Sequence, residues 1–445
     1  MKTLYTVFLL ELRRVFSKRN IVILILFLML CLYFVQVGIH HYRTIIDNKD
    51  KFLETERLKT DLYINYAVYA AYGFRLQFVP SPLSVLFVNS TVISELSSNV
   101  DVASLLNIYK SYKGRILFAE KSGGFKDFAG IILLFGTMMV LYLGFETFLN
   151  KDYIRFISSF IQPKKLFYYI VGSRLLLLVL YFFFMTIGSI ILLGINRIQL
   201  LKNEFSHLYY YLLVMAIMLV FFFIIGLVAG TIKSRFAGFI MVISVWFIFV
   251  FLIPGVIQSL IATRAENITS GYDLELKKLQ AHMGFEKRAM EQEGVLKDSL
   301  QNTQSERDIM ESYWKNELKK IQSLEKNMEN DMRKNIRNFQ RMSLIVPSSF
   351  YISVSNEISS KGYKNFVNFF NYLQKLKEGF VRFYIDKRFY SNFSKVELYI
   401  KGEENIYYSR NLLPDYFIWG VCLSLLYIMS LFIFAYYRFK GSLVI

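Results

Sequence analysis

The chain has 445 residues, of which 54% are hydrophobic and only 19% are charged. The apolar residues gather in blocks of about 20, the length that a helix needs to cross the hydrocarbon core of a bilayer. A soluble protein of this size would divide them into shorter, periodic stretches. The distribution therefore excludes an ordinary soluble protein and predicts an integral membrane protein.

The net charge of +18 could suit a nucleic-acid-binding protein, but 17% aromatic residues and long uncharged runs fit a membrane better. Cations at the ends of spans are explained by topology and by anionic lipid. Membrane lipid is therefore an expected partner, and nucleic acid is not. Cys31 and Cys422 both lie inside apolar blocks. They are expected to be small buried side chains and not part of a disulfide or a metal site.

Residues 1–19 are basic and amphipathic, with Leu9, Leu12 and Phe16 on one face, which predicts a helix lying on the membrane surface. Six apolar blocks follow and predict six transmembrane helices. These blocks cover 21–39, 128–145, 169–195, 209–229, 237–260 and 416–437. The expected fold class is an all-α membrane protein, with span one in 20–39, spans two to five in 128–260, and span six with a short tail in 414–445.

Lysine and arginine gather in four segments that the six spans place on one side of the bilayer. These cations are Arg13, Arg14, Lys18, Arg19, Lys151, Arg155, Lys164, Lys165, Lys233, Arg235, Arg438 and Lys440. Cytoplasmic loops carry the excess of lysine and arginine. Both termini are therefore expected in the cytoplasm, with the chain as a multi-pass protein of the cytoplasmic membrane.

Two long segments, 40–127 and 261–413, are then expected outside the cytoplasm as mainly helical domains. Within the second, residues 264–342 lack proline and carry apolar residues at helical spacing, which predicts a long helical hairpin that turns near 298–308. The hairpin is either a solvated spacer or a stalk that docks a partner or the other outside domain and relays motion from span five. The stretches 61–112 and 351–411 mix aromatic and polar residues and predict small, mostly helical α+β caps.

No residues carry recognisable covalent chemistry. The sequence lacks a GxxxxGK[ST] phosphate loop, and its four histidines lack metal-ligand spacing, so neither catalytic residues, bound metal nor cofactor is expected in this chain. Charged residues deep inside the spans, which an ion-coupled transporter needs, are almost absent. Glu146 and Arg174 lie near the cytoplasmic ends, where side chains can reach the interface by snorkelling. The energy for transport is therefore expected to come from another subunit and not from an ion gradient coupled through this chain.

The loop between spans two and three contains an amphipathic segment that begins after Glu146 and ends at Pro163. Its apolar residues stand among cations, which predicts a short surface helix over 151–163 that could contact a cytoplasmic partner. The residues selected as the candidate coupling site are Glu146, Lys151, Arg155, Phe156, Ile157, Phe160 and Pro163.

In these features the chain resembles the ABC-2 type permeases, the membrane subunits of type-2 ABC exporters. Those proteins have an N-terminal interfacial helix, six spans, an acidic residue after span two and a coupling helix that ends near proline. The matching positions are Glu146, 151–160, Pro163 and Arg174, although the usual Gly-Thr step after the acid is replaced by Thr147 and Phe148. A subgroup with large outside insertions also has a Pro-x-Pro-Leu element, which Pro80, Pro82 and Leu83 resemble.

The resemblance implies a permease without enzymatic activity of its own, coupled to a separate cytoplasmic ABC ATPase that binds ATP and Mg²⁺. It also implies a second permease subunit, identical or different. Spans two and five would line the path of the cargo. Two alternatives remain: an ABC complex that transmits mechanical work to a periplasmic protein, and a membrane-anchored scaffold with no ATPase.

Overall fold

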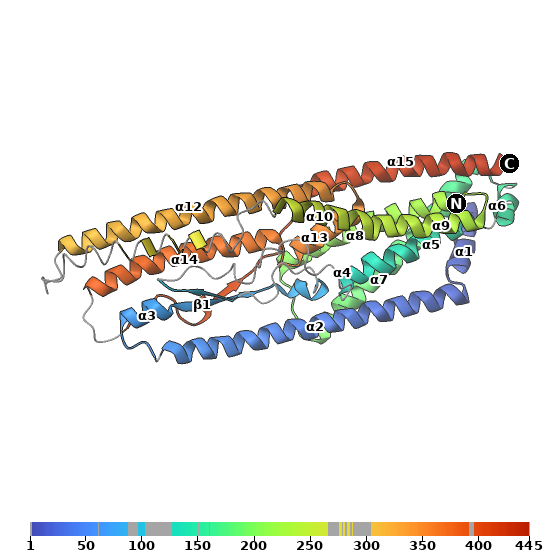
Figure 1. Ribbon diagram of the computed structural model, residues 1–445. Helices are drawn as coiled ribbons and strands as arrows, with labels where there is room; N and C mark the ends of the chain where they lie inside the picture. The colour runs from blue at the N-terminus through green and yellow to red at the C-terminus, as the bar shows by residue number, and fades with distance from the viewer. Residues whose placement is uncertain are drawn as a thin grey trace.

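The structure is a computed structural model, and it shows an elongated, mostly helical body with both termini at one end (Figure 1). We call this the terminal end, and the part beyond the spans at the other end the distal domain. The described residues are 2–60, 62–87, 97–102, 127–149, 151–159, 161–265, 304–390 and 396–444, with short pieces between 276 and 287. All statements below concern these residues.

Six helices are long and apolar enough to cross a membrane, which confirms the six predicted spans. Spans one, three and four are single helices, and spans two and five are each interrupted by a wider turn. The helices are α2 (Lys18–Thr60), α4 (Phe128–Ile131) with α5 (Thr137–Thr147), α7 (Pro163–Ile195), α8 (Lys202–Gly230), α9 (Arg235–Phe247) with α10 (Ile253–Ala265), and α15 (Phe417–Val444).

Helices α5 and α8 form the centre of the bundle, where most of their residues are buried. Their backbones touch at glycines: a Cβ on Gly144 would lie 2.3 Å from the carbonyl oxygen of Phe223, and one on Gly226 would lie 2.2 Å from that of Leu141. Gly230 meets α5 in the same way, so Gly226 and Gly230 form a GxxxG pair. Such pairs let transmembrane helices pack by direct backbone contact. Spans five and six are mostly exposed and lie at the edge of the bundle.

Spans two and five each contain one π-helical turn, Ile132–Gly136 and Ile248–Leu252. The two spans meet beside these turns, where the indole nitrogen of Trp246 donates to the carbonyl oxygen of Leu134 at 3.2 Å. The hydroxyl of Thr137 donates to the same carbonyl at 3.3 Å. Side chains therefore satisfy a carbonyl group inside the irregular turn, as the apolar membrane interior requires.

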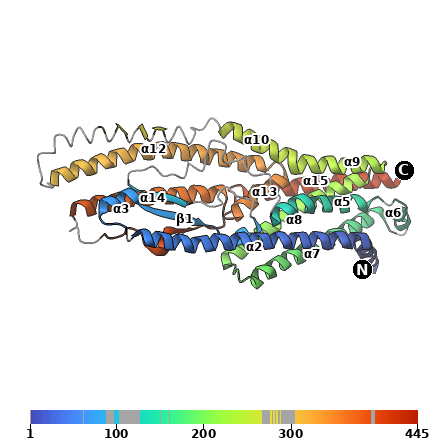
Figure 2. The same ribbon diagram turned by 60° about the horizontal axis from the view of Figure 1, so that its bottom comes forward.

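Helix α2 continues far beyond the expected end of span one at residue 39. At 1.5 Å per residue its 43 residues measure about 65 Å, about twice the thickness of the hydrocarbon core. The second half of α2 runs along the distal domain (Figures 1 and 2). The hydropathy of the sequence marked only the apolar half, because the helix itself does not end where the membrane does.

The distal domain contains a three-stranded sheet in the order β2-β1-β3. Strand β1 (Phe74–Val79) pairs antiparallel with β2 (Ser97–Val100) and parallel with β3 (Ile406–Tyr408), with Gln77 opposite Ile406. The strands fall within both stretches predicted as α+β caps, but they form one shared sheet. The all-α class therefore holds for the spans and needs this correction for the distal domain.

Helices cover this sheet and complete the distal domain. They are α3 (Tyr66–Tyr72), α12 (Gln304–Ser343), α13 (Pro347–Ile358) and α14 (Tyr363–Tyr390), with short 3₁₀ turns at Pro82–Leu86 and Gly402–Asn405. Helix α12 is the second arm of the predicted hairpin, and the positions described from 276 to 287 are helical. Of the turn predicted at 298–308, residues 304–308 already belong to α12 and residues 298–303 lie outside the described residues, so the hairpin itself stays a prediction.

The Pro-x-Pro-Leu element joins the distal domain to the spans. Leu83 is fully buried, and Phe87 packs edge-to-face on Tyr211 of span four with ring centroids 4.9 Å apart. The Ser81 amide donates to the Ser360 hydroxyl at 2.7 Å, and the Asn411 side chain donates to the Ser81 hydroxyl at 2.8 Å. Three distant parts of the sequence are thus fixed at one junction beside the membrane.

A carboxyl group is buried at this junction. The side chain of Glu357, in the last turn of α13, accepts from the Lys364 amide at 3.3 Å and from the Gln340 side chain at 3.4 Å. Burial raises its pKa from the ordinary 4.5 to about 7, against the opposing effect of the nearby Lys364 ammonium. Burial also lowers the pKa of Lys361 from 10.5 to about 8.

Stability of the purified protein should therefore depend on pH. Folded Glu357 binds a proton more tightly than the unfolded residue, so its contribution is lost as the pH rises from 4.5 through about 7. The apparent Tm should fall over this range. Since a shift of one pKa unit corresponds to about 1.36 kcal/mol, the free energy of unfolding should decrease by roughly 3 kcal/mol. Lys361 acts in the opposite direction and only above about pH 8.

Replacement of Glu357 by Gln should flatten the decrease of Tm between pH 5 and 7.5, measured by thermal unfolding in detergent. The exposed Glu403→Gln, which removes a carboxylate from the same domain, should leave the decrease in place. A slope that is unchanged in the Glu357 variant would show that this carboxyl does not titrate as its burial requires.

Candidate functional site

The predicted coupling segment lies at the terminal end, beside both chain termini (Figure 1). Helix α6 (Lys151–Ser158) forms within it, between the end of span two and the start of span three. Helix α1 (Lys2–Val15) lies at the same end and packs on α7. Helix α1 and the loop between spans two and three, which are far apart in the sequence, therefore lie at the same end.

A buried ion pair connects α1 to span three. The Nε atom of Arg174 lies 2.6 Å from Oε2 of Glu11, and the two side chains are 2% and 0% exposed. The Nη1 atom of Arg14 donates to the other oxygen of Glu11 at 2.9 Å. The carboxylate thus receives charged donors on both oxygens, which offsets the cost of removing it from water.

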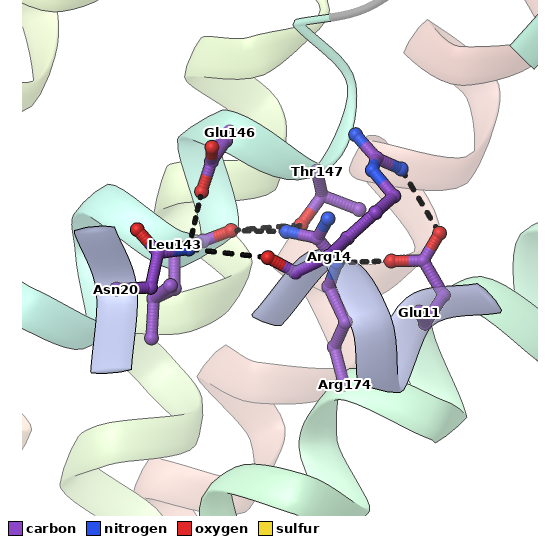
Figure 3. Close-up of polar contacts among 7 residues, drawn as sticks. All are labelled: Glu11, Arg14, Asn20, Leu143, Glu146, Thr147 and Arg174. Atoms are coloured by element: carbon purple, nitrogen blue, oxygen red, sulfur yellow. Dashed lines mark hydrogen bonds and ion pairs between the residues drawn. The ribbon is translucent and has the colours of Figure 1, made fainter. Parts of the chain in front are cut away.

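Arg174 also binds span two. Its Nη1 atom donates to the Leu143 carbonyl at 2.9 Å and to the Thr147 hydroxyl at 3.0 Å (Figure 3). The Thr147 hydroxyl in turn donates to the Leu143 carbonyl at 2.9 Å. A cation beside the last carbonyls of a helix is favourable because it compensates the negative end of the helix dipole. Arg174 therefore ties α1, α5 and α7 together.

Asn20 extends this network to Glu146. Its Nδ2 atom donates to the Arg14 carbonyl at 3.3 Å and reaches the Glu146 carboxylate at 3.5 Å (Figure 3). Asn20 is buried in the first turn of α2, close to the N-terminal end of that helix. Glu146 is half-buried at the end of span two, so it connects the start of the loop to span one.

Helix α6 is partly embedded in the protein. Ile154 and Ile157 are buried, whereas Phe156 is 67% exposed. Pro163 is exposed and begins α7, where its missing amide hydrogen costs no hydrogen bond. Lys151 and Arg155 belong to α6, but their side chains lie outside the described part, and Phe160 lies outside the described residues altogether.

An aromatic contact fixes the other side of the loop. Phe148, just after span two, packs on Phe167 of span three and on Phe439 of span six, with ring centroids 5.9 and 4.8 Å apart. The loop that carries α6 is therefore connected to spans two, three and six by buried side chains. Of the predicted apolar coupling residues, Ile157 serves this internal packing and Phe156 is presented at the surface.

The described part of this site joins separate elements through ion pairs, hydrogen bonds and aromatic contacts. The described residues contain no group of three or more His, Cys, Asp or Glu side chains that could hold a metal ion. Among the described groups, Glu11, Arg14 and Arg174 are paired with each other, and Arg174 also binds a backbone carbonyl. The sequence predicted that the Arg174 side chain reaches the interface by snorkelling. It is instead buried, because it pairs with Glu11 inside the protein.

Glu11 was not selected from the sequence, although a signal exists. It is the only acidic residue before Asp47, and it stands in a segment otherwise rich in lysine and arginine. It also shares a helical face with Val7 and Val15, which are both buried. An acidic residue on the buried face of a basic helix requires a buried cation as its partner, and Arg174 fills that role.

No protein-family model matches the chain, and neither the curated proteins nor the solved structures include one significantly similar to it.

Loss of the arginine should destabilise the whole bundle. In Arg174→Met the carboxylate of Glu11 keeps only Arg14, and removal of one partner from a buried pair typically costs about 3–5 kcal/mol. We expect the apparent Tm in detergent to fall by about 5 °C or more. Arg174→Lys should recover only part of this loss, because an ammonium cannot match the fork of donors that serves Glu11 and Leu143 at once.

Arg235→Met provides the matched control, since it removes an exposed cation at the N-terminal end of α9. Its effect should stay within about 0.5 kcal/mol. Equal Tm values for the Arg174 and Arg235 variants would mean that the buried network contributes nothing to stability.

Proposed function

We propose that this chain is the membrane-spanning permease of an ATP-driven ABC exporter, coupled to a separate cytoplasmic ATPase. The observation that carries the proposal is how α6 is packed. This short helix between spans two and three buries Ile154 and Ile157 and exposes Phe156. A helix that receives force needs both an exposed contact and a stiff connection to the spans. The resemblance of the loop to the coupling helix of ABC-2 permeases supports the same proposal.

The buried network gives that connection. A displacement of α6 would act on span two, whose last turn contains Glu146, and on span three through Phe148, which packs on Phe167, and through Pro163. Arg174 joins both spans to α1, so the three elements move as one unit. Packed interfaces of this kind shift between discrete arrangements and do not deform gradually.

The position of charge supports an external source of energy. Apart from Arg174, the apolar blocks of the six spans contain no lysine, arginine, aspartate or glutamate over 21–39, 128–145, 169–195, 209–229, 237–260 and 416–437. Proton- and sodium-coupled transporters place such groups near the middle of the membrane. In the proposal ATP and Mg²⁺ bind to the partner ATPase, and this chain contributes no catalytic residue.

The proposed orientation places the terminal end, with α6 and both termini, in the cytoplasm of a bacterial cell. Lysine and arginine are concentrated there, as cytoplasmic loops require. The distal domain then lies outside the inner membrane, where a periplasmic protein can reach it. A second permease subunit, identical or different, would complete the assembly against the mostly exposed outer spans.

Spans two and five are the proposed moving walls of the cargo path. Both contain a π-helical turn, and such turns are frequent at functional sites because they leave backbone groups that can change partners. The bond from Trp246 to Leu134 joins the two spans at that point. Reorientation of span two by the loop would therefore be passed directly to span five.

A second candidate function is mechanical work on a periplasmic partner. Span five continues into α10, which packs against α12, and α12 extends about 60 Å along the distal domain at 1.5 Å per residue (Figure 2). A rigid helix of this length connected to a moving span is suited to act on another protein. An ATPase rate that responds to a purified periplasmic protein, and to no small substrate, would favour this candidate.

The coupling role predicts a selective loss of the ATPase. Phe156→Asp places a charge on the exposed surface of α6 without entering the bundle, so the spans should stay folded while the partner is released. The tagged variant should recover at most about a tenth of the ATPase that the unaltered chain recovers, given that an aromatic anchor commonly contributes more than 2 kcal/mol. Quantitative mass spectrometry of peptides from a subunit with a phosphate loop measures this.

Tyr72→Asp is the control, because it makes the same change at an exposed aromatic residue of the distal domain. It should leave recovery of the ATPase unchanged. If the unaltered chain is purified intact from its native membrane with no nucleotide-binding subunit, the scaffold hypothesis replaces the exporter.

A further inference from the structure

The last turns of α12 have two different faces. Asn335, Ile336, Phe339 and Gln340 are buried against the rest of the distal domain. The opposite face carries Arg333, Lys334, Arg337 and Arg341, all of them exposed. Residues 334, 337 and 341 follow the i, i+3, i+7 spacing of one helical stripe. From residue 330 to 343 the only acid is Asp331, so this surface is strongly positive.

This basic stripe ends where the membrane begins. The side chain of Arg341 donates from Nε to the hydroxyl of Tyr416 at 2.7 Å, and its guanidinium lies 5.1 Å from the centre of that ring. Tyr416 directly precedes span six, whose first residues Ile418 and Trp419 are 74% and 70% exposed. Exposed tryptophan and tyrosine at a span end mark the level of the lipid headgroups.

The distances of Arg337 and Lys334 beyond Arg341 can be compared with the depth of the lipid headgroup layer. Helix α12 runs along the long axis of the molecule, as the spans do (Figures 1 and 2). At 1.5 Å per residue Arg337 lies about 6 Å and Lys334 about 10 Å beyond Arg341. The headgroup layer is about 5–7 Å deep on each side of the hydrocarbon core. The backbones of Arg341 and Arg337 therefore lie within it, and that of Lys334 lies a few ångström beyond its outer limit.

The local chemistry favours a phosphate. Tyr416 holds the Nε side of Arg341 in place, and the two Nη atoms have no hydrogen-bond partner among the residues that the structure describes. Guanidinium groups bind phosphate oxygens through pairs of N–H donors. The nearby carboxylate of Asp415 is already paired with Lys364, so it does not neutralise the arginines.

We propose that Arg337 and Arg341, supported by Lys334 and Tyr416, bind the phosphate of an anionic phospholipid in the leaflet that faces the distal domain. The acyl chains of this lipid lie along Ile418 and Trp419 at the start of span six. A soluble acidic protein would match the charge but would gain nothing from the exposed apolar residues directly below it. A lipid matches both surfaces. The site depends on the position of the spans and not on the coupling function proposed above.

Titration of the detergent-solubilised full chain with phosphatidylglycerol, followed by native mass spectrometry, tests the proposal. The unaltered chain should retain phosphatidylglycerol in preference to phosphatidylcholine. In Arg337→Gln/Arg341→Gln the apparent affinity should fall about 30-fold, since each basic side chain near an anionic lipid surface contributes roughly fivefold. Thermal unfolding without added lipid confirms that this variant is folded.

Lys319→Gln/Lys326→Gln is the matched control, because it removes two exposed cations from the same helix further from the membrane. It should leave the binding of phosphatidylglycerol unchanged, and free glycerol phosphate should not compete. Equal losses in the two double variants would show attraction to net charge alone. Equal retention of both lipids, or competition by glycerol phosphate, would also overturn the lipid site.

Discussion

The buried pair of Arg174 and Glu11 is the constraint on which the terminal end depends. A guanidinium and a carboxylate that leave water together need donors and acceptors for every remaining polar atom. Arg14, Leu143 and Thr147 provide them, and each comes from an element that would otherwise be free to move on its own. The requirement for full pairing therefore holds the surface helix α1 and spans two and three in one arrangement.

The rest of the architecture follows from how tightly each span is packed. Spans two and four meet through Gly144 and Gly226 with no side chain between them, which makes the centre of the bundle rigid. Spans five and six expose most of their residues. The distal domain contacts both groups: Tyr351 of α13 donates to the Ala129 carbonyl of span two at 3.0 Å, and the Ser348 hydroxyl donates to the Phe249 carbonyl of span five at 2.5 Å. Helix α13 of the distal domain is thus bonded to both span two and span five.

Hydropathy and the periodicity of apolar residues predicted the helices, because both reflect neighbouring residues in the sequence. The apolar blocks predicted all six spans, and the helical spacing of apolar residues from Trp314 to Phe339 predicted the helix that the structure shows as α12. Contacts between distant residues could not be predicted in this way. Glu11 and Arg174 are 163 residues apart, and Gln77 pairs with Ile406 across most of the chain, so nothing near either residue identifies its partner. Within the coupling site, the amphipathic pattern found α6 but could not separate the buried Ile157 from the exposed Phe156.

A double-mutant cycle on the buried pair tests the central claim most directly. Unfolding free energies would be compared for the unaltered chain, Glu11→Gln, Arg174→Met and the double variant in the same detergent. Direct partners in a buried network should be coupled by about 2 kcal/mol or more, so the double variant should be far more stable than the sum of the single losses allows. Additive losses, within about 0.5 kcal/mol, would show that the two side chains act independently and that α1 is not bound to the spans through them.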